Sequence, residues 1–329
     1  MGHCMVGVSV VKNEADIIEA NIRHNLRYLD RMIVFDHDSC DATPRILQSL
    51  AAEGLPITLL TRRTDRHEFA FWQGEFMTAL ARLAFEQHGA DYVFPIDADE
   101  FLDAPARETI EAALGACPNE IANIEWRTYV PGLGDVGQHP LESLRWRIET
   151  AVPALPKIVI SRRVMAREWM VGRGNHFFCN RAGSELSIHS AASVEGFGLA
   201  HLPFRSPQQL MAKVLVGWLS RKLAYGTKAQ STHNSWHIRE LFGRIVAGET
   251  IGMDDVRRYA IALYALNRLP LPGDEAEFRL IEAPVAEPMP LRYTDAAGVD
   301  PARLLALWSS ALIDSLTQAS GNAPTQTAR

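Results

Sequence analysis

The chain has 329 residues, of which 47% are hydrophobic and 22% charged, and 33 basic against 39 acidic side chains give a formal charge of −6. This composition is typical of a folded globular protein with a sizeable core, and it excludes extensive disorder. A mildly acidic chain without long basic runs argues against nucleic acid as the main partner, although one pocket can still be basic enough for a phosphate-bearing ligand.

The cysteines and the first segment bear on the cellular compartment. The four cysteines show no paired short spacing, so we expect neither a zinc site nor a disulfide framework. The first segment lacks a basic region, and no window offers a long uncharged apolar stretch. We therefore expect a cytoplasmic protein without a transmembrane segment, located in the cytoplasm at large or peripherally at the inner face of the membrane.

The first hundred residues alternate short β-branched runs with helical patterns. Strands are expected at 5–11, 32–35, 57–60 and 92–96, and helices at 16–29, 42–53 and 69–85. The second helix has Thr43 and Pro44 at its start and Gly54 at its end. This alternation predicts an α/β fold with a mixed, mostly parallel sheet flanked by helices.

The remaining chain is less regular. A helix is expected at 109–116 and strands at 121–126 and 157–161, while the Gly- and Pro-rich stretch 130–156 predicts a long loop. Mostly helical patterns follow from 208, interrupted by a proline-rich, irregular stretch at 270–290. The expected organisation is a first domain at 1–205, a C-terminal helical extension at 206–317 and a disordered tail at 318–329.

Three polar clusters follow predicted strands, at residues 12–14, 36–39 and 97–100. In an open α/β sheet, ligands bind at the carboxyl ends of the strands, so we expect the clusters to form one site. None has the glycine spacing of a dinucleotide fingerprint or a P-loop. Acidic side chains in the first two clusters suit ribose hydroxyls or base N–H groups, but Glu14, Asp38 and Asp41 are equally suited to stabilising the start of a helix.

Asp97 and Asp99 are separated by one residue directly after a predicted strand. Both carboxylates can turn toward one hard divalent cation, Mg²⁺ or Mn²⁺, which such sites usually share with substrate phosphates. The alternative is that both are turn and capping residues, a common role of aspartate. The two other clusters at the same edge favour the metal site.

Several segments together resemble a known family. The segments VKNEADIIEANIRHNLRYLDRMIVFDHDSCDATPRIL and FPIDADEFL resemble the nucleotide-sugar-binding half of the family 2-like glycosyltransferases of the GT-A fold. They are most similar to the branch with KNE, D-x-D-S-x-D-x-T and D-x-D-E-F motifs. PKIVISRR, RGNHFF and LAHLPFRSPQQLMAKVLVGW follow in the order of that branch, so the resemblance covers roughly residues 5 to 220.

The resemblance implies a GT-A-like fold and roles for particular residues. The nucleotide-sugar site that it implies consists of Asn13, Glu14, Asp36 and Asp97. Asp97 and Asp99 would bind Mn²⁺ or Mg²⁺ and through it the diphosphate, and His201 would complete the metal site. A metal ion stabilises the charge on a departing diphosphate without a proton.

Basic and proton-accepting groups complete the expected site. Arg205 is expected to contact the diphosphate, with Lys157 and Lys213 as further candidates. An inverting enzyme needs a general base for the acceptor hydroxyl. His176, which matches a histidine position in the resembled branch, is the first choice, ahead of Glu100 beside the aspartate pair. Further candidates for the base are Glu168, His189 and Glu195.

The aromatic side chains near the predicted long loop have two interpretations. Trp126, Tyr129 and Trp169 can stack on sugar faces, but aromatic residues more often fill cores. Trp126 ends a predicted strand and is kept as a candidate acceptor contact.

The predicted function is that of a metal-dependent glycosyltransferase, which moves a sugar from a nucleoside-diphosphate sugar to a hydroxyl of a glycan or glycolipid acceptor. The alternative from another class is a non-catalytic glycan- or nucleotide-binding protein with the same fold. A sugar-phosphate nucleotidyltransferase is less favoured, because residues 12–16 do not resemble its glycine- and arginine-rich loop.

Overall fold

The computed structural model describes residues 2–61, 73–132, 139–150, 154–166, 168–182, 185–188, 190–225, 236–266, 268–269, 277–285, 289–298, 300–307 and 309. The strands are β1 (Met5–Val11), β2 (Arg31–Asp36), β3 (Ile57–Thr61), β4 (Tyr92–Pro95), β5 (Glu100–Asp103), β6 (Ile121–Val130), β7 (Trp146–Thr150), β8 (Lys157–Ser161), β9 (Trp169–Val171), β10 (Phe178–Ala182), β11 (Glu185–Ile188), β12 (Ala192–His201) and β13 (Phe278–Glu282). The labelled α-helices are α1 (Ile18–Asn25), α2 (Thr43–Ala52), α3 (Gln73–Gln87), α4 (Arg107–Gly115), α5 (Pro140–Ser143), α6 (Pro207–Tyr225), α7 (Trp236–Val246) and α8 (Met253–Ile261), and residues 301–307 are also helical. Shorter helical turns are η1 (Arg162–Ala166), η2 (Arg173–Asn175) and the π-helical η5 (Ala262–Leu266).

The main sheet has the strand order β13-β7-β6-β8-β4-β1-β2-β3, and β12 pairs with both β5 and β6. Pairing is parallel from β4 through β1 and β2 to β3, and again between β6 and β12. The other pairings are antiparallel, and β9, β10 and β11 form a small separate sheet. The predicted α/β fold with a mixed sheet flanked by helices is confirmed.

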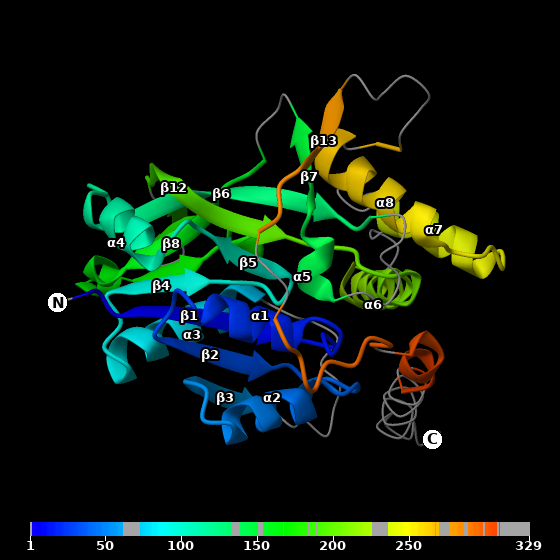
Figure 1. Cartoon of the computed structure of the whole chain (residues 1–329), viewed down its shortest axis with the longest axis horizontal. Coiled ribbons are helices and arrows are strands. Elements are labelled where there is room, and N and C mark those ends of the chain that lie inside the picture. Colours follow the sequence, from blue (N-terminus) through cyan, green and yellow to red (C-terminus); the bar gives the residue numbers. More distant parts are fainter. Residues whose placement is uncertain are drawn as a thin grey trace, which may run out of the picture.

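Helices cover both faces of the parallel strands (Figure 1). Along β1, Met5 and Val11 join the core beneath α1 and α2, whereas Val6 and Val8 join the core beneath α3. This alternation is the period of two that a strand imposes on its side chains. The predicted start of α2 is confirmed, and Gly54 follows it with a left-handed φ of 86°.

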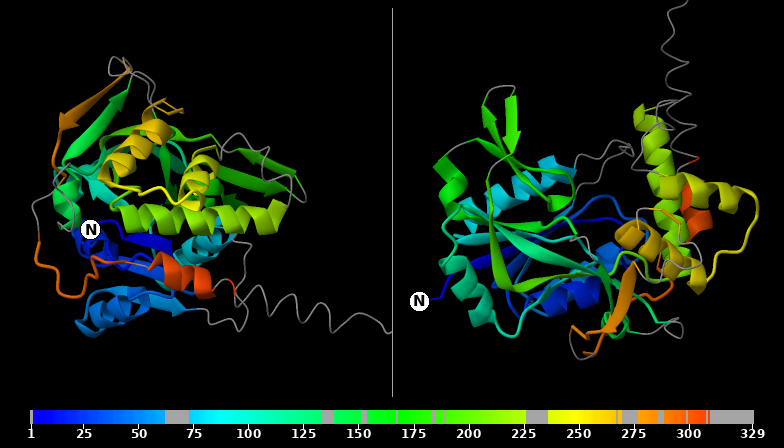
Figure 2. Two further views of the ribbon diagram at one scale, coloured as in Figure 1. Left: turned by 90° about the vertical axis from the view of Figure 1, so that its right-hand side faces the viewer. Right: turned by 90° about the horizontal axis from the view of Figure 1, so that it is seen from above.

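The C-terminal helices lie at one end of the sheet. Helix α6 crosses the carboxyl ends of the parallel strands, and α7 and α8 pack beside it (Figures 1 and 2). Leu210 and Val214 of α6 share a core with Leu241 of α7 and with Val256 and Tyr259 of α8. The extension therefore covers the edge where the polar clusters lie.

Two stretches differ from the sequence prediction. Within 130–156, where a long loop was expected, the structure has α5 and β7, because Ile148 packs into the core beneath α6 and α8. Within the proline-rich stretch 270–290, Phe278–Glu282 forms β13 by antiparallel pairing with β7. Both elements depend on partners distant in sequence, which local composition does not reveal. The tail at 318–329 lies outside the described residues, as do residues 62–72 at the expected start of α3.

Among the helices that the structure describes, none combines the length and the apolar character needed to cross a membrane.

Candidate active site

A cleft of about 440 Å³ opens at the carboxyl ends of β1, β2 and β4, and α6 and η5 contribute further lining residues to it. Its polar and aromatic lining residues are Lys12, Glu14, His37, Gln73, Asp97, Asp99, Trp126, Lys157, His176, His201, Lys213 and Tyr264. The three polar clusters thus meet at one edge, as predicted from the sheet topology. The lining contains Glu14, Asp97, Asp99, His176 and His201 from the predicted site, whereas Asn13, Asp36, Glu100 and Arg205 are not among the lining residues.

Asp97 is held in place by three side chains. Its Oδ1 accepts hydrogen bonds from Gln73 Nε2 at 2.7 Å and Asn175 Nδ2 at 3.1 Å. Its Oδ2 accepts one from Lys157 Nζ at 3.1 Å. Asn175 has a left-handed φ of 58°, a conformation that asparagine tolerates better than most residues. Each carboxylate oxygen of Asp97 therefore accepts at least one hydrogen bond from a neighbouring side chain.

Asp99 lies between a histidine and a lysine. Its Oδ2 is 3.7 Å from His201 Nε2 and 3.1 Å from Lys213 Nζ. Burial by itself would raise the pKa of Asp99, but the cationic Lys213 and the His201 ring outweigh it and hold the pKa well below its usual range. Asp99 is therefore a carboxylate at neutral pH. Burial also lowers the pKa of His201, so its ring is neutral and able to donate a lone pair.

Glu100 and Lys157 form a buried ion pair behind the aspartates. Lys157 Nζ lies 2.6 Å from Glu100 Oε1, and Glu100 Oε2 accepts a hydrogen bond from the backbone N–H of Asp97 at 2.9 Å. Burial raises the pKa of Glu100 to about 7, and the neighbouring ammonium group opposes that rise. Glu100 is fully buried and does not face the cleft, so it fixes the turn that carries Asp97.

An aromatic group forms one wall of the cleft. The Trp126 ring stacks on His201 with centroids 4.3 Å apart and meets His176 edge-on at 5.0 Å. Tyr264 of η5 contacts both Trp126 and His201 edge-on. Lys157 Nζ lies 4.9 Å from the centroid of the Trp126 ring, within cation–π range. The candidate acceptor contact Trp126 is therefore the centre of this wall, which also orients His201.

The loops after β1 and β2 are joined to each other. Asn13 has a left-handed φ of 58°, and its Oδ1 accepts a hydrogen bond from Cys40 N at 2.8 Å. Its backbone N–H donates to Ser39 Oγ at 2.9 Å. Asp41 accepts hydrogen bonds from the backbone N–H groups of Ala15 and Thr43, but the N-cap position of α2 is Ala42, and no side chain caps the helix there. Asn13 therefore shapes the loop pair without lining the cleft.

Asp36 is a buried carboxylate at the end of β2. Its Oδ2 accepts a weak hydrogen bond from Ser39 N at 3.4 Å, and its Oδ1 has no hydrogen-bond partner among the described residues. Burial raises the pKa of Asp36. A buried acceptor atom without a protein donor is uncommon and is satisfied when a ligand supplies one.

Arg205 is engaged by two carboxylates of the first loop. Its Nε and Nη2 donate to Asp16 at 2.7 and 2.9 Å, and Nη2 also donates to Glu14 Oε2 at 2.6 Å. Bidentate pairing of this kind fixes both partners geometrically. Arg205 therefore orients Glu14 toward the cleft, whereas Lys213 places a cation beside Asp99.

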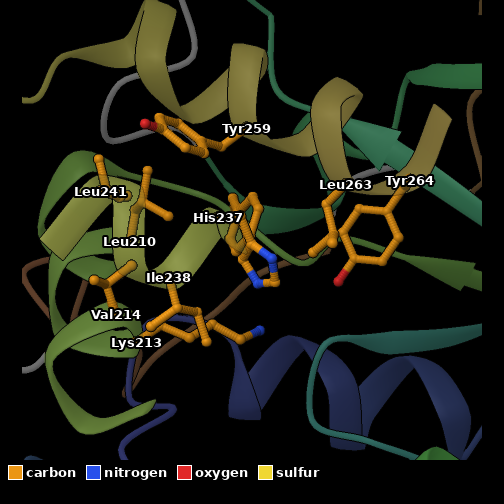
Figure 3. Close-up of a pocket in the computed structure, with 10 residues that line it drawn as sticks. Leu210, Lys213, Val214, His237, Ile238, Leu241, Tyr259, Leu263 and Tyr264 are labelled. Carbon is orange, nitrogen blue, oxygen red and sulfur yellow. The ribbon is translucent and has the colours of Figure 1, made fainter. Parts of the chain in front are cut away.

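A second, apolar cavity of about 120 Å³ adjoins the cleft within the helical extension (Figure 3). Leu210, Val214 and Leu241 contribute to its lining. Lys213 and Tyr264 line both this cavity and the cleft. The extension therefore contributes side chains directly to the site.

Three site residues were missed by the sequence analysis: Gln73, Asn175 and Tyr264. Asn175 precedes His176 in the quoted RGNHFF segment, which is a usable signal. Gln73 and Tyr264 come from regions whose patterns indicate only helices. Of the other candidates for a base, Glu168 and Glu195 are exposed and absent from the cleft lining, and His189 lies outside the described residues.

The donor set partly fits a divalent cation. Asp99 Oδ2 and His201 Nε2 line the cleft 3.7 Å apart and are of the types that Mn²⁺ accepts. Asp97 already uses both oxygens, and no three His, Cys, Asp or Glu side chains of the described ranges converge as a metal-binding group. A cation would thus be held by Asp99 and His201, and Asp97 Oδ2, which accepts a hydrogen bond only from Lys157 among the described residues, keeps a lone pair with which it can join them.

No protein-family model and no curated protein matches the sequence. Among solved structures, the chain resembles S. aureus TarS residues 1–349 in complex with UDP, with a TM-score of 0.35, 13% identity, and coverage of 74% of this chain and 72% of that one. It also resembles the mannosyltransferase PcManGT from Pyrobaculum calidifontis in complex with GDP-Man and Mn²⁺, with a TM-score of 0.35 and 16% identity, and the match covers 80% of this chain and 81% of that one. A third match is glucosyl-3-phosphoglycerate synthase from Mycobacterium tuberculosis in complex with Mn²⁺, UDP and glucosyl-3-phosphoglycerate. The TM-score is 0.30 and the identity 18%, and the match covers 51% of this chain and 60% of that one. Likeness of this degree does not assign a function to the chain.

Proposed function

We propose that this chain is a metal-dependent glycosyltransferase that moves a sugar from a nucleoside-diphosphate sugar to a hydroxyl of a glycan or related acceptor. The observation that carries the proposal is the arrangement around Asp99 at the carboxyl end of β4. A buried, ionised carboxylate lies between an imidazole and an ammonium group in a cleft large enough for a nucleotide sugar.

Asp99 and His201 are the proposed holders of Mn²⁺ or Mg²⁺, with Asp97 as the third member. A cation bound there would offset the negative charge that develops on the departing diphosphate. Lys213 supplies a second positive charge beside the same oxygen of Asp99 that His201 approaches, 3.1 Å from Oδ2. Lys157 keeps Asp97 oriented toward the cleft.

The nucleoside is proposed to bind where the loops after β1 and β2 meet. The buried Asp36 Oδ1 is suited to accept a hydrogen bond from a ribose hydroxyl or a base N–H. Glu14, oriented by Arg205, offers a second acceptor in the cleft lining. Asn13 holds the two loops together.

His176 is the proposed general base for the acceptor hydroxyl. Its Nδ1 lies 2.9 Å from the carbonyl oxygen of Pro156, which favours the tautomer with the proton on Nδ1 and the lone pair on Nε2. Burial, together with the nearby Lys157, lowers the pKa of His176, so the ring is neutral at pH 7. Glu100 is proposed to support the turn at Asp97.

Calorimetry tests the proposal. UDP and GDP are titrated into the protein with and without Mn²⁺, using wild type, Asp99→Ala and the matched control Asp254→Ala, which changes an exposed aspartate of α8. We expect Mn²⁺-dependent binding in wild type and in the control, and at least tenfold weaker binding in Asp99→Ala.

Two results would contradict the proposal. Wild type that binds no common nucleoside diphosphate with Mn²⁺ would exclude a nucleotide-sugar transferase, and unchanged affinity in Asp99→Ala would remove the aspartate from the site. Binding without hydrolysis or transfer of the sugar of any common nucleotide sugar would favour the non-catalytic binding protein.

A further inference from the structure

A second hollow, of about 670 Å³, lies along β6, β7 and β12 and meets the cleft at its aromatic wall. Trp126 and Tyr264 line both spaces. Pro156, whose carbonyl oxygen contacts His176 Nδ1, lines this hollow, and His176 lines the cleft. The side chain proposed as the general base therefore lies where the two spaces adjoin. We call the larger one the β6 groove.

The β6 groove results from the way β6 changes partners. Residues Ile121–Ile124 pair with β8, whereas Tyr129 and Val130 pair with β7. The four residues between these two pairings line the groove, and on their other edge they pair with β12. The groove thus lies along the stretch of β6 where its pairing passes from β8 to β7.

The lining of the β6 groove contains both polar and apolar side chains, and four of its charged side chains have partners of opposite charge; the exposed Glu195 forms no ion pair with another described residue. Arg127 donates hydrogen bonds to Asp103 and to Glu125, and Arg147 Nη2 lies 3.6 Å from Glu149. Neutral groups such as those of Asn123 and Thr128 contribute further donors and acceptors.

These features distinguish among ligand classes. A phosphorylated or sulfated ligand requires cations without carboxylate partners, and an acyl chain requires a lining without charged side chains, so the groove favours neither. Sugar hydroxyls both donate and accept hydrogen bonds, and charged side chains held in fixed pairs serve both needs. The Trp126 ring supplies the flat apolar surface on which sugar rings stack.

Building on the proposed function, we infer that the β6 groove binds the acceptor, and that the acceptor is a neutral oligosaccharide. The volume of the β6 groove lies within the roughly 300–1,000 Å³ that is typical of ligand pockets. The groove is therefore larger than a single monosaccharide needs. The sugar at the Trp126 end would present its hydroxyl to His176, and the following units would extend along β6 and β7.

The test uses two variants in the groove and one matched control. Arg147→Met removes a guanidinium group from the lining, and Ser193→Tyr adds a bulky side chain at an exposed position of the lining. The control Arg279→Met changes an exposed arginine on the adjacent strand β13, outside the lining. None of these residues belongs to the proposed donor or metal site.

Binding is measured on an array of neutral di- to hexasaccharides, with phosphorylated and acyl-linked glycans as separate sets, in the presence of UDP or GDP and Mn²⁺. Nucleotide affinity is measured by calorimetry on the same preparations. We expect wild type and Arg279→Met to bind neutral oligosaccharides, both groove variants to bind them at least tenfold more weakly, and all four proteins to bind nucleotide within twofold of one another.

Equal oligosaccharide binding by wild type and both groove variants would overturn the inference. Binding restricted to phosphorylated or acyl-linked glycans would also overturn it, as would the absence of any glycan binding by a protein that binds nucleotide. The nucleotide-binding part of the proposed function would stand after each of these results. Wild type that binds no nucleotide would instead overturn the proposed function.

Discussion

The ammonium group of Lys213 lies 3.1 Å from Asp99 Oδ2, although the two residues are separated by 114 positions in the chain. Asp99 follows β4 in the parallel part of the sheet, and Lys213 belongs to α6 of the helical extension. The contact makes α6 part of the candidate active site, and it gives the extension a chemical role that its composition does not indicate.

Replacing Lys213 with methionine removes this charge and keeps most of the side-chain volume. If Lys213 offsets charge on the diphosphate, the rate of sugar transfer should fall about 100-fold, the size expected for loss of one electrostatic contact in an active site. Steady-state kinetics with the donor identified by calorimetry measures the effect. Gln208→Met on the exposed face of the same helix should leave the rate unchanged, and a full rate in Lys213→Met would exclude the role.

Asn13 should contribute to stability through its backbone and its side chain. Asn13→Ala places a residue poorly suited to φ of 58° at this position and leaves Cys40 N without its acceptor, so we expect a loss of about 2–3 kcal/mol in the free energy of unfolding. Asn13→Gly retains the backbone conformation and should lose only about 1 kcal/mol. Urea denaturation measures both, and an equal loss in the two variants would show that the left-handed conformation contributes nothing.

Glu19 should hold the C-terminal segment 292–294 against α1. Its buried carboxylate accepts hydrogen bonds from the backbone N–H groups of Arg292, Tyr293 and Thr294 at 2.7–2.9 Å. Burial by itself would raise the pKa of Glu19, but these donors and Arg23 outweigh it and lower the pKa. Glu19→Gln places an amide N–H₂ among these donors and should speed tryptic cleavage after Arg292.

Limited proteolysis followed by mass spectrometry measures this release. Glu111→Gln serves as the control, because Glu111 also pairs with an arginine four residues away but does not contact the segment. Cleavage after Arg292 at the wild-type rate in Glu19→Gln would show that other contacts hold the segment.

His24 should make the folded state sensitive to acid. The ring is fully buried, its Nε2 lies 2.6 Å from the Leu102 carbonyl oxygen, and burial lowers its pKa from 6.5 to about 4. As the pH falls from 6.5 to 4, His24 becomes protonated in the unfolded chain but stays neutral in the folded state, so the free energy of unfolding decreases over that range. The difference amounts to about 3 kcal/mol.

The pH dependence can be isolated by comparison with His24→Gln, which retains an N–H donor for Leu102 and cannot titrate. The free energy of unfolding of the variant should fall less between pH 6.5 and 4 than that of wild type. Parallel curves for the two proteins would contradict a buried neutral histidine. Denaturant titrations at several pH values supply the measurement.

Much of the fold follows from local patterns. The strand Met5–Val11 was predicted with its observed bounds, and α2 was predicted from Thr43, Pro44 and Gly54, because these signals act within a few residues. Strands β7 and β13 were not predicted, since β13 pairs with β7 and β7 pairs with β13 and β6, all through antiparallel contacts that local composition does not reveal. The meeting of the three polar clusters was predicted because parallel strands place their carboxyl ends at one edge.

The sequence by itself determined which strands alternate with which helices, because hydrophobic periodicity can be read within each element. It also determined that Asp97 and Asp99 lie beside Glu14 at one edge of the sheet, because parallel strands place their carboxyl ends at the same edge. Only the tertiary structure decided that Arg205 pairs with Asp16 outside the cleft lining, that Lys213 reaches Asp99, and that Tyr264 closes the aromatic wall. Those three contacts join residues more than 60 positions apart. Their geometry depends on how α6 and η5 pack across the strand ends, which no pattern within a short stretch of chain encodes.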